Sequence, residues 1–462
     1  MNSILAFIGI LGAAVVLHEF GHFIVAKLFK IRVETFSVGF GPRLFGAKVG
    51  HTDYRVSLIP LGGYVKLGGD ESNAPLEGAG GADIPPEEMF NLRPRWQRIL
   101  VALAGPVMNV KTAIAIPLVA ALLYGIPATP APIVSAVSPG GNAEAAGLRT
   151  GDRIVSFNGK ENPKWDHIRG DALLSPGRQL PMEVERNGER VQLTLTPSSH
   201  TEDGETFGLL DFLPDYGDLP VIVREVQPNT PAAEAGLLVG DRIVAVSGQP
   251  VRSAEQVTQM IRDHKEEPVT LTVERNGERV DVVGRARKLD DGRVRLGFRP
   301  DEQIPYQSAG LIAATGYAVR ANVEILRLTG KALGQLFTGE RSARNTLAGP
   351  IGIYRAASSS VEKLGWAGFF AMLGFLSLNL GIFNLLPIPV LDGGAIFLLL
   401  IEGALATVGL QLSATLRDRI QQVGFVMVIL LMVFVITNDL IKQASIWRGS
   451  GGDPPAATEP AK

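Results

Sequence analysis

The chain has 462 residues, about three times the roughly 150 residues used as a prior for one domain, so several structural units are expected. Its 44 Lys and Arg residues against 46 Asp and Glu residues give a net charge of -2, which excludes the global positive field that holds a nucleic acid. The absence of Cys excludes disulfides, iron–sulfur clusters, thiolate zinc sites and thiol nucleophiles, so any metal must bind to His, Asp or Glu.

Four apolar regions are of membrane length or close to it. Hydrophobic residues make up 46% of the chain and charged residues 19%, below the roughly 25% of soluble domains, which indicates that part of the chain lies in lipid. The regions cover residues 4–28, 99–124, 365–400 and 423–436 with its flanks. We therefore predict a multi-pass α-helical membrane protein with about four transmembrane helices.

The first apolar region carries an H-E-x-x-H pattern. His18 and His22 are four residues apart and share one helix face, so both imidazoles can bind one metal ion while Glu19 beside them handles a proton. The alternative is a buried, hydrogen-bonded polar cluster that braces helix packing, although a carboxylate in lipid is costly unless it is used or paired. No Lys or Arg precedes the apolar stretch, so we expect a retained helix and not a signal peptide.

A β hairpin is predicted between the first and second apolar regions. Residues 36–42 and 54–60 are typical of short strands punctuated by Gly and Pro. Basic residues flank this loop, whereas none precedes the first apolar region: Lys27, Lys30, Arg32, Arg43, Arg93, Arg95 and Arg98. The positive-inside rule therefore places the loop in the cytoplasm and the region after the second helix on the opposite side.

Residues 127–300 contain an internal repeat. The segment around Gly147 recurs around Gly236, and the Arg-Asn-Gly-Glu-Arg stretch from Arg186 recurs from Arg275, both offset by 89 positions (236 − 147 and 275 − 186). Each Asn-Gly pair predicts a hairpin with a type I′ turn, and each of the two aligned glycines predicts the end of a short helix. The pattern A-x-x-A-G-L-x-x-G-D-x-I resembles PDZ domains of bacterial proteases, which implies modules that bind extended peptide ends at a sheet edge.

The remaining chain is predicted to hold an amphipathic helix and a broken membrane helix. Residues 309–336 place apolar side chains at helical spacing among charged ones, which indicates a helix on the membrane surface. The third apolar region is interrupted by Pro387, Pro389 and a Gly pair, so we expect a broken helix that lines something. Its only Asp, Asp392, is a candidate third metal ligand or, alternatively, a helix cap. Residues 449–462 are predicted to be disordered.

Together these motifs resemble the site-2 protease family of intramembrane zinc metalloproteases, peptidase family M50, and within it the sigma-E regulator type with tandem PDZ domains. The resemblance runs essentially from end to end. It is carried by the H-E-F-G-H helix, Gly-Pro-Val-Met-Asn at residues 105–109, the repeat, Gly-Pro-Ile-Gly-Ile at 349–353 and N-x-x-P-x-P-x-L-D-G at 384–393.

This resemblance implies a site and its chemistry. It implies that His18, His22 and Asp392 bind one Zn²⁺ per chain and that Glu19 is the catalytic base. It also implies that the hairpin is membrane-re-entrant, with an edge that could pair with an unwound substrate. Four further residues are expected to position the substrate backbone: Asn384, Asn109, Pro387 and Pro389. Lys111 departs from the apolar pattern of the family, and we interpret it as snorkelling toward the cytoplasmic surface in preference to contacting the site.

The implied domain order alternates membrane and soluble segments. It runs through a first helix at 1–30, a cytoplasmic-side loop with the hairpin at 31–98, a second helix at 99–126, PDZ domains at 127–218 and 219–302, an amphipathic helix and linker at 303–364, the broken third helix at 365–403, a fourth helix at 415–441 and a tail at 449–462. We expect the bacterial inner membrane, with the PDZ domains in the periplasm and the active site near the cytoplasmic side.

The predicted function is cleavage of transmembrane segments of pre-trimmed single-pass membrane proteins, such as an anti-sigma factor or remnant signal peptides. The lipid bilayer is the expected surroundings, and no nucleic-acid partner is expected. The PDZ pair would bind newly exposed C-termini or exclude bulky substrates, and we favour exclusion because neither repeat shows a clear carboxylate-binding loop. The alternative function is a non-catalytic scaffold that binds protein C-termini, which leaves the intramembrane polar residues without a purpose. A transporter is less favoured because no inverted repeat is visible.

Overall fold

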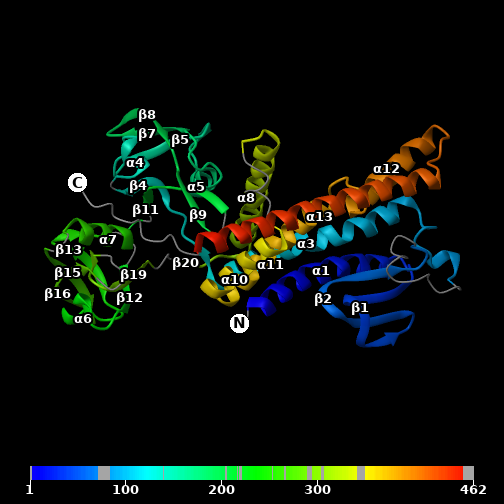
Figure 1. The fold of residues 1–462 in the computed structure, drawn as a ribbon, viewed down its shortest axis with the longest axis horizontal. Helices are drawn as coiled ribbons and strands as arrows, with labels where there is room; N and C mark the ends of the chain where they lie inside the picture. The colour runs from blue at the N-terminus through cyan, green and yellow to red at the C-terminus, as the bar shows by residue number, and fades with distance from the viewer. Residues whose placement is uncertain are drawn as a thin grey trace, which may run out of the picture. The chain divides into compact units, whose positions relative to one another are not determined.

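The chain folds into two compact units. A helical unit contains Met1–Leu123 and Gly310–Lys462, and a β unit contains Tyr124–Ala309. The computed structural model describes residues 3–70, 84–138, 140–202, 205–215, 217, 221–251, 253–264, 267–288, 294–302, 306–340 and 349–450. The predicted disordered tail lies outside the described residues from residue 451 onward. Figure 1 shows the elements of both units in chain order.

Four helices of the described chain are long and apolar enough to cross a membrane. They are Ser3–Leu28, Arg95–Tyr124, Trp366–Asn384 and Thr415–Gln443, which correspond to the four predicted apolar regions. The first three are the helices α1, α3 and α11, and the fourth lies within α13 (Ala414–Ser450). The predicted break of the third region is confirmed, because α11 ends at Asn384 and α12 (Asp392–Thr407) begins after a seven-residue turn.

The helices of this unit pack through small residues. Ala6, Ile10 and Ala14 of α1 are buried against Ala357 and Val361 of α10 (Pro350–Leu364). The alanines among them allow the two backbones to approach closely, as small residues do where helices associate in lipid. The predicted amphipathic helix is α8 (Leu311–Phe337), and its buried Asn322 donates an amide hydrogen bond to the carbonyl of Ala113 in α3 at 3.0 Å.

A buried carboxylate of α13 caps helix α10. Asp439 accepts backbone hydrogen bonds from Gly349 at 3.1 Å, Ile351 at 2.9 Å and Gly352 at 3.2 Å. These N–H groups belong to the start of a helix and have no partner within it, so the carboxylate satisfies them. A Cβ atom at Gly349 would lie 2.5 Å from the Asp439 carboxylate, which explains why glycine occupies this position. The cap therefore ties the C-terminal helix to the Gly-Pro-Ile-Gly segment.

The predicted hairpin is longer than its sequence pattern indicated. Its strands are β1 (Val33–Val49) and β2 (Thr52–Leu67), and the first part of β1 pairs with both ends of β2, so that Thr35 faces both Lys66 and Asp53. The strands bend where Gly and Pro interrupt them, which allows this doubled pairing. A short 3₁₀ helix, η1 (Pro86–Glu88), follows in the described part of the loop.

The β unit contains two modules with the same strand order. The sheet order is β11-β4-β5-β7-β8 with β6 beside β5 in the first module, and β19-β12-β13-β15-β16 with β14 beside β13 in the second. The first module comprises β4 (Ala131–Val137), α4 (Asn142–Ala145), β5 (Arg153–Phe157), β6 (Lys160–Glu161), α5 (Trp165–Leu173), β7 (Leu180–Arg186), β8 (Glu189–Leu195) and β11 (Phe212–Asp215). The second comprises β12 (Val221–Val226), α6 (Pro231–Glu234), β13 (Arg242–Val246), β14 (Gln249–Pro250), α7 (Ala254–Asp263), β15 (Pro268–Arg275), β16 (Glu278–Arg285) and β19 (Phe298–Glu302). Short pairs complete the unit: β3 (Ile126–Pro127) with β20 (Tyr306–Gln307), β9 (Ser198–Glu202) with β10 (Glu205–Leu209), and β17 (Arg287–Lys288) with β18 (Val294–Arg295).

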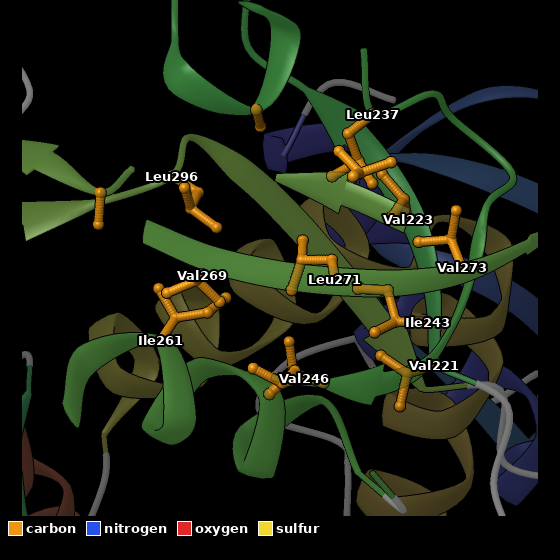
Figure 2. Packing of buried hydrophobic residues seen from close by; sticks show 14 residues of the cluster. Val221, Val223, Leu237, Ile243, Val246, Ile261, Val269, Leu271, Val273 and Leu296 are labelled. Carbon is orange, nitrogen blue, oxygen red and sulfur yellow. The ribbon is translucent and has the colours of Figure 1, made fainter. Parts of the chain in front are cut away.

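The predicted Asn-Gly turns are confirmed in both modules. Two residues join β7 to β8 and β15 to β16, and Asn187 and Asn276 both have φ of 53° with a positive φ at the following glycine. Two consecutive positive φ angles are what a type I′ turn requires. The module cores differ in composition: Trp165 packs edge-to-face on Phe212 in the first, whereas Figure 2 shows an aliphatic core of Val, Leu and Ile in the second.

An ion pair between a buried aspartate and a partly exposed arginine repeats in the two modules. Arg186 donates to both carboxylate oxygens of Asp152 at 2.7 Å and to the Gly147 carbonyl at 2.7 Å, and Arg275 makes the equivalent bonds to Asp241 and to the carbonyl of Gly236. Burial raises the pKa of each aspartate, but hydrogen bonds from the arginine and a backbone N–H outweigh burial, so both pKa values lie below their ordinary value. Each pair clamps the end of a short helix to a hairpin.

Candidate metal centre

The two histidines of α1 point their outer ring nitrogens at one place. His18 is buried and His22 is nearly so, and their rings pack edge-to-face with centroids 4.8 Å apart. The two Nε2 atoms are 3.2 Å apart. Residues four apart in a helix share a face, and here the shared face holds two nitrogen ligands close enough to bind one ion.

Asp392 meets the histidines from the first residue of α12. Its Oδ2 lies 3.0 Å from the Nε2 of His18, and its Oδ1 lies 3.5 Å from the Nε2 of His22. The three ligand atoms all lie within 4.8 Å of one another, the only such group of three that His, Asp or Glu side chains form in the described part of the chain. The structure thus brings together residues that are 370 positions apart (392 − 22).

The turn before α12 determines where Asp392 emerges. The N–H of Leu391 donates to the Ile388 carbonyl at 3.1 Å across Pro389 and Val390, and Val390 has a φ of 87°. Proline followed by a residue with positive φ is the pattern of a type II turn. The N–H of Ile388 bonds back to Leu386 at 2.7 Å, which places Pro387 at the centre of a tighter turn. In this structure the two prolines shape the turn.

Two glycines let α12 start against that turn. A Cβ atom at Gly393 would collide with the carbonyl of Leu385, and one at Gly394 would collide with the carbonyl of Ile388. Only a residue without a side chain permits so close an approach of backbone to backbone. In the Asp-Gly-Gly sequence the aspartate can bind a metal, and the two glycines leave the space that lets α12 begin close to the turn.

Helix α3 supplies the outer contacts of the two imidazoles. The Nδ1 of His22 donates to the carbonyl of Val101 at 2.7 Å, which leaves its Nε2 free to bind a metal. The Nδ1 of His18 lies 3.3 Å from the amide nitrogen of Asn109. Gly105 lies between these contacts, and a Cβ atom there would collide with the rings of both histidines, at 2.8 Å from the Cε1 of His18. Sequence reasoning missed Val101, because a backbone carbonyl has no residue signature, and read Gly105 only as part of a motif.

The other predicted residues lie at different distances from the cluster. The amide nitrogen of Asn384, at the end of α11, is 3.3 Å from the Nε2 of His18. Glu19 is half-buried on α1, next to His18 in the chain. Lys111 is exposed on α3, whereas Asn109 on the same helix has no exposed surface. The structure thus brings Asn384 and Asn109 to the histidines.

The donor set suits zinc. Zinc accepts imidazole nitrogen and carboxylate oxygen, and catalytic zinc sites use three protein ligands with a fourth position for water or substrate. The amide oxygen of Asn109 is buried without a hydrogen-bond partner among the described residues. The amide nitrogen of the same side chain lies 3.3 Å from the Nδ1 of His18, the ring nitrogen that must carry a proton when Nε2 binds a metal. The orphaned acceptor and the three ligand atoms both fit a bound cation.

Comparisons with known proteins agree with this chemistry. The chain matches the family described as Peptidase family M50 over residues 6–431. It is 33% identical to the regulator of sigma-E protease RseP of Salmonella typhimurium, with 95% of this chain and 98% of that protein covered. The protein of the same name from Escherichia coli K12 is also 33% identical, over 94% of this chain and 97% of its own length. A Vibrio cholerae protein named as a zinc metalloprotease is 31% identical over 95% of this chain.

Proposed function

Because the chain belongs to peptidase family M50 and is a zinc metalloprotease of the site-2 type, we propose that it holds one zinc ion on His18, His22 and Asp392. The observation that carries this proposal is the convergence of three ligand atoms within 4.8 Å from helices at opposite ends of the chain. The scaffold alternative leaves this cluster without a purpose, and membership of a protease family argues against it.

Catalysis divides between the metal and the residues around it. Zinc, when bound, polarises the scissile carbonyl and lowers the pKa of water toward neutrality. Glu19 accepts the proton of the attacking water and then donates it to the leaving nitrogen, which balances the hydrolysis of the amide. Asn384, whose amide lies beside the ligand atoms, donates a hydrogen bond to the substrate backbone. The turn at Pro387 and Pro389 holds Asp392 in place throughout.

The substrates proposed are transmembrane segments of membrane proteins. A helix in lipid shields its peptide bonds, so it must unwind before hydrolysis, and an edge of the β1–β2 hairpin offers hydrogen bonds to the unwound segment. Ring contacts of Phe20 with Phe36 and of Phe23 with Tyr54 support a location of this hairpin against α1, the helix that carries the catalytic base. An anti-sigma factor as substrate fits the names of the relatives, which are regulators of sigma-E. Remnant signal peptides are the other substrate class proposed.

The proposed setting is a bacterial inner membrane with the β unit in the periplasm. The basic residues that surround the hairpin support a cytoplasmic location for that loop, and α3 then carries the chain across to the β unit. There the two modules act as a size filter for pre-trimmed substrates, or bind their C-termini. Cleavage of untrimmed substrates after deletion of residues 127–302 would support the filter, and unchanged selectivity would argue against it.

The zinc content of the purified, full-length protein tests the proposed site. We expect about one zinc per chain in wild type, and its loss, together with proteolysis, in both His22→Ala and Asp392→Ala. His200→Ala is the matched control, because His200 packs on Phe207 in the β unit and should leave the zinc content unchanged. A wild-type protein that binds no zinc after reconstitution, or two variants that keep it, would refute the site.

A further inference from the structure

The side chain of Asn109 lies beside His18, and one of its two polar atoms has no hydrogen-bond partner among the described residues. The residue has no exposed surface, and its amide nitrogen lies 3.3 Å from the Nδ1 of His18. Its amide oxygen is buried and has no hydrogen-bond partner among the described residues. An unpaired acceptor in a dry interior costs free energy, so an arrangement that uses it is favoured.

If His18 binds a metal, its Nδ1 atom needs a hydrogen-bond acceptor as its partner. The Nε2 of His18 faces Asp392 and the Nε2 of His22, so it is the nitrogen that offers its lone pair to a shared ion. The Nδ1 of the same neutral ring then carries the proton and can only donate a hydrogen bond. An amide nitrogen is also only a donor, whereas an amide oxygen is an acceptor. Half a turn of the Asn109 amide exchanges the two atoms and brings the oxygen against Nδ1.

We propose that Asn109 is the positioning residue of His18, with its amide oxygen accepting the Nδ1 hydrogen when the cluster binds zinc. This inference rests on the proposed zinc site and assigns to Asn109 a role through the ligand, in place of the contact with substrate expected from the sequence. Outer partners of this kind orient a metal-bound imidazole and fix its tautomer.

The spacing along α3 supports the assignment. The carbonyl of Val101 already accepts the Nδ1 hydrogen of His22 at 2.7 Å. Val101, Gly105 and Asn109 lie at intervals of four residues and therefore share one face of the helix. The first and last supply acceptors for the two imidazoles, and the glycine between them leaves room for the rings. A single helix face thereby orients both histidine ligands.

Burial argues against direct contact between Asn109 and substrate. Besides having no exposed surface, the residue is covered by α11, where a Cβ atom at Gly381 would lie 3.2 Å from the Cβ of Asn109. A substrate could reach the Asn109 amide only if α11 moved away. Asn384, by contrast, is half-buried at the end of α11 and keeps part of its surface open.

Competition titration of zinc against a chelator tests the proposal on the full-length protein in detergent. We expect Asn109→Leu, which keeps the branching of the side chain and removes the acceptor, to weaken zinc binding by about 10–100-fold. Asn109→Asp restores an acceptor and should recover most of that loss. Asn322→Leu is the matched control: Asn322 is also a buried asparagine against α3, but it donates to the Ala113 carbonyl, so its removal should leave zinc affinity unchanged.

The outcomes separate this inference from the proposed function. Unchanged zinc affinity in Asn109→Leu, with a raised KM, would overturn the inference and return Asn109 to substrate binding, while zinc loss in His22→Ala would keep the site itself. Equal zinc loss in Asn109→Leu and Asn322→Leu would also overturn it, because general packing would then explain the effect. Wild-type protein without zinc would refute both. Asn109→Ala repeats the test without an added branched side chain if the leucine variant does not fold.

Discussion

The helical unit and the β unit both withdraw carboxylates from water, but they give them different partners. Asp152 and Asp241 each face an arginine, whose charge is permanent, through two hydrogen bonds. Asp392 faces two imidazoles, which are charged only when protonated. In each Asp–Arg pair the two charges neutralise each other. The Asp392 cluster instead brings together three candidate ligand atoms for a cation. A carboxylate drawn in from water thus stabilises the fold in the β unit, and in the helical unit it forms part of the proposed metal site.

The partner, and not the unit, decides the role of a buried carboxylate. Asp439 belongs to the helical unit, yet its oxygens accept three backbone N–H groups at the start of α10. Backbone N–H groups satisfy the hydrogen bonding of a carboxylate without any cation. Asp439 therefore resembles Asp152 and Asp241 in stabilising the fold. The comparison therefore predicts that substitutions fall into two classes, those that remove zinc or activity and those that loosen the fold.

The largest expected effect comes from Glu19, which belongs to the first class. Glu19→Gln keeps the size and polarity of the side chain but cannot take a proton from water, so we expect proteolysis to fall by about 10²–10⁴-fold. Zinc content and thermal unfolding should stay at wild-type values, because Glu19 is not one of the three ligands. Single-turnover cleavage of a membrane substrate measures the effect. Full activity in a variant that keeps its zinc would remove Glu19 from the mechanism.

Removing one charge in each unit tests the comparison directly. Asp392→Asn should weaken zinc binding by at least about tenfold and leave the β unit unchanged, because an amide binds a cation more weakly than a carboxylate. Asp152→Asn should leave zinc binding unchanged and destabilise the first module by about 2 kcal/mol, through loss of charge-assisted hydrogen bonds.

Zinc titration measures the change in zinc binding, and hydrogen exchange of β5 and β7 measures the stability of the first module in the same samples. The second module serves as the internal control, because its own pair, Asp241 with Arg275, is intact in both variants. A loss of zinc in Asp152→Asn, or a loosened β unit in Asp392→Asn, would show that the two kinds of carboxylate are not separate.

A weaker effect is expected at Asp439. Asp439→Asn leaves one oxygen to accept hydrogen bonds and removes the negative charge at the helix start, so we expect local destabilisation of about 1 kcal/mol. Faster hydrogen exchange at the amides of Gly349, Ile351 and Gly352 would report it, with unchanged zinc content. Unchanged exchange at these three amides would mean that α10 is held by its packing against α1 alone.

Local and periodic features could be predicted from the sequence. The pair of histidines four residues apart, the repeat with its Asn-Gly turns and the apolar regions depend on short-range spacing, which the fold preserves. The break before Asp392 was predictable because two prolines and two glycines do not fit an unbroken helix. The approach of Asp392 to His18 and His22, which lie far away in the sequence, was inferred only from residue type and family resemblance.

Contacts that depend on backbone atoms or on tertiary packing could not be predicted. The Val101 carbonyl is present whatever residue occupies position 101, so no pattern marks its bond to His22. Asp439 lies at the flank of an apolar run, and its partners are 90 positions away near Gly349. The doubled pairing of β1 with β2 depends on bends within each strand, which the pattern of short strands did not reveal. The complete burial of Asn109 depends on the cover from α11, which the sequence did not reveal.

The smallest expected effect is a pH dependence confined to the β unit. The pKa values of Asp152 and Asp241 are lower in the folded modules than the ordinary value of about 3.9, so the unfolded chain takes up protons first as pH falls. Their contribution to stability is therefore complete above about pH 4 and is lost as pH falls through the folded pKa values. Because protonation removes the same charge as Asp152→Asn, its effect on the first module should not exceed that of the substitution.

Unfolding of the two modules between pH 6 and pH 3, followed by hydrogen exchange corrected for its intrinsic pH dependence, measures this loss. In Asp152→Asn the first module should lose most of its pH dependence while the second keeps the dependence contributed by Asp241. If the first module of that variant stayed as acid-sensitive as wild type, other carboxylates would carry the effect. The Asp–Arg pair would then be a geometric clamp between Gly147 and its hairpin, and not a source of electrostatic stability.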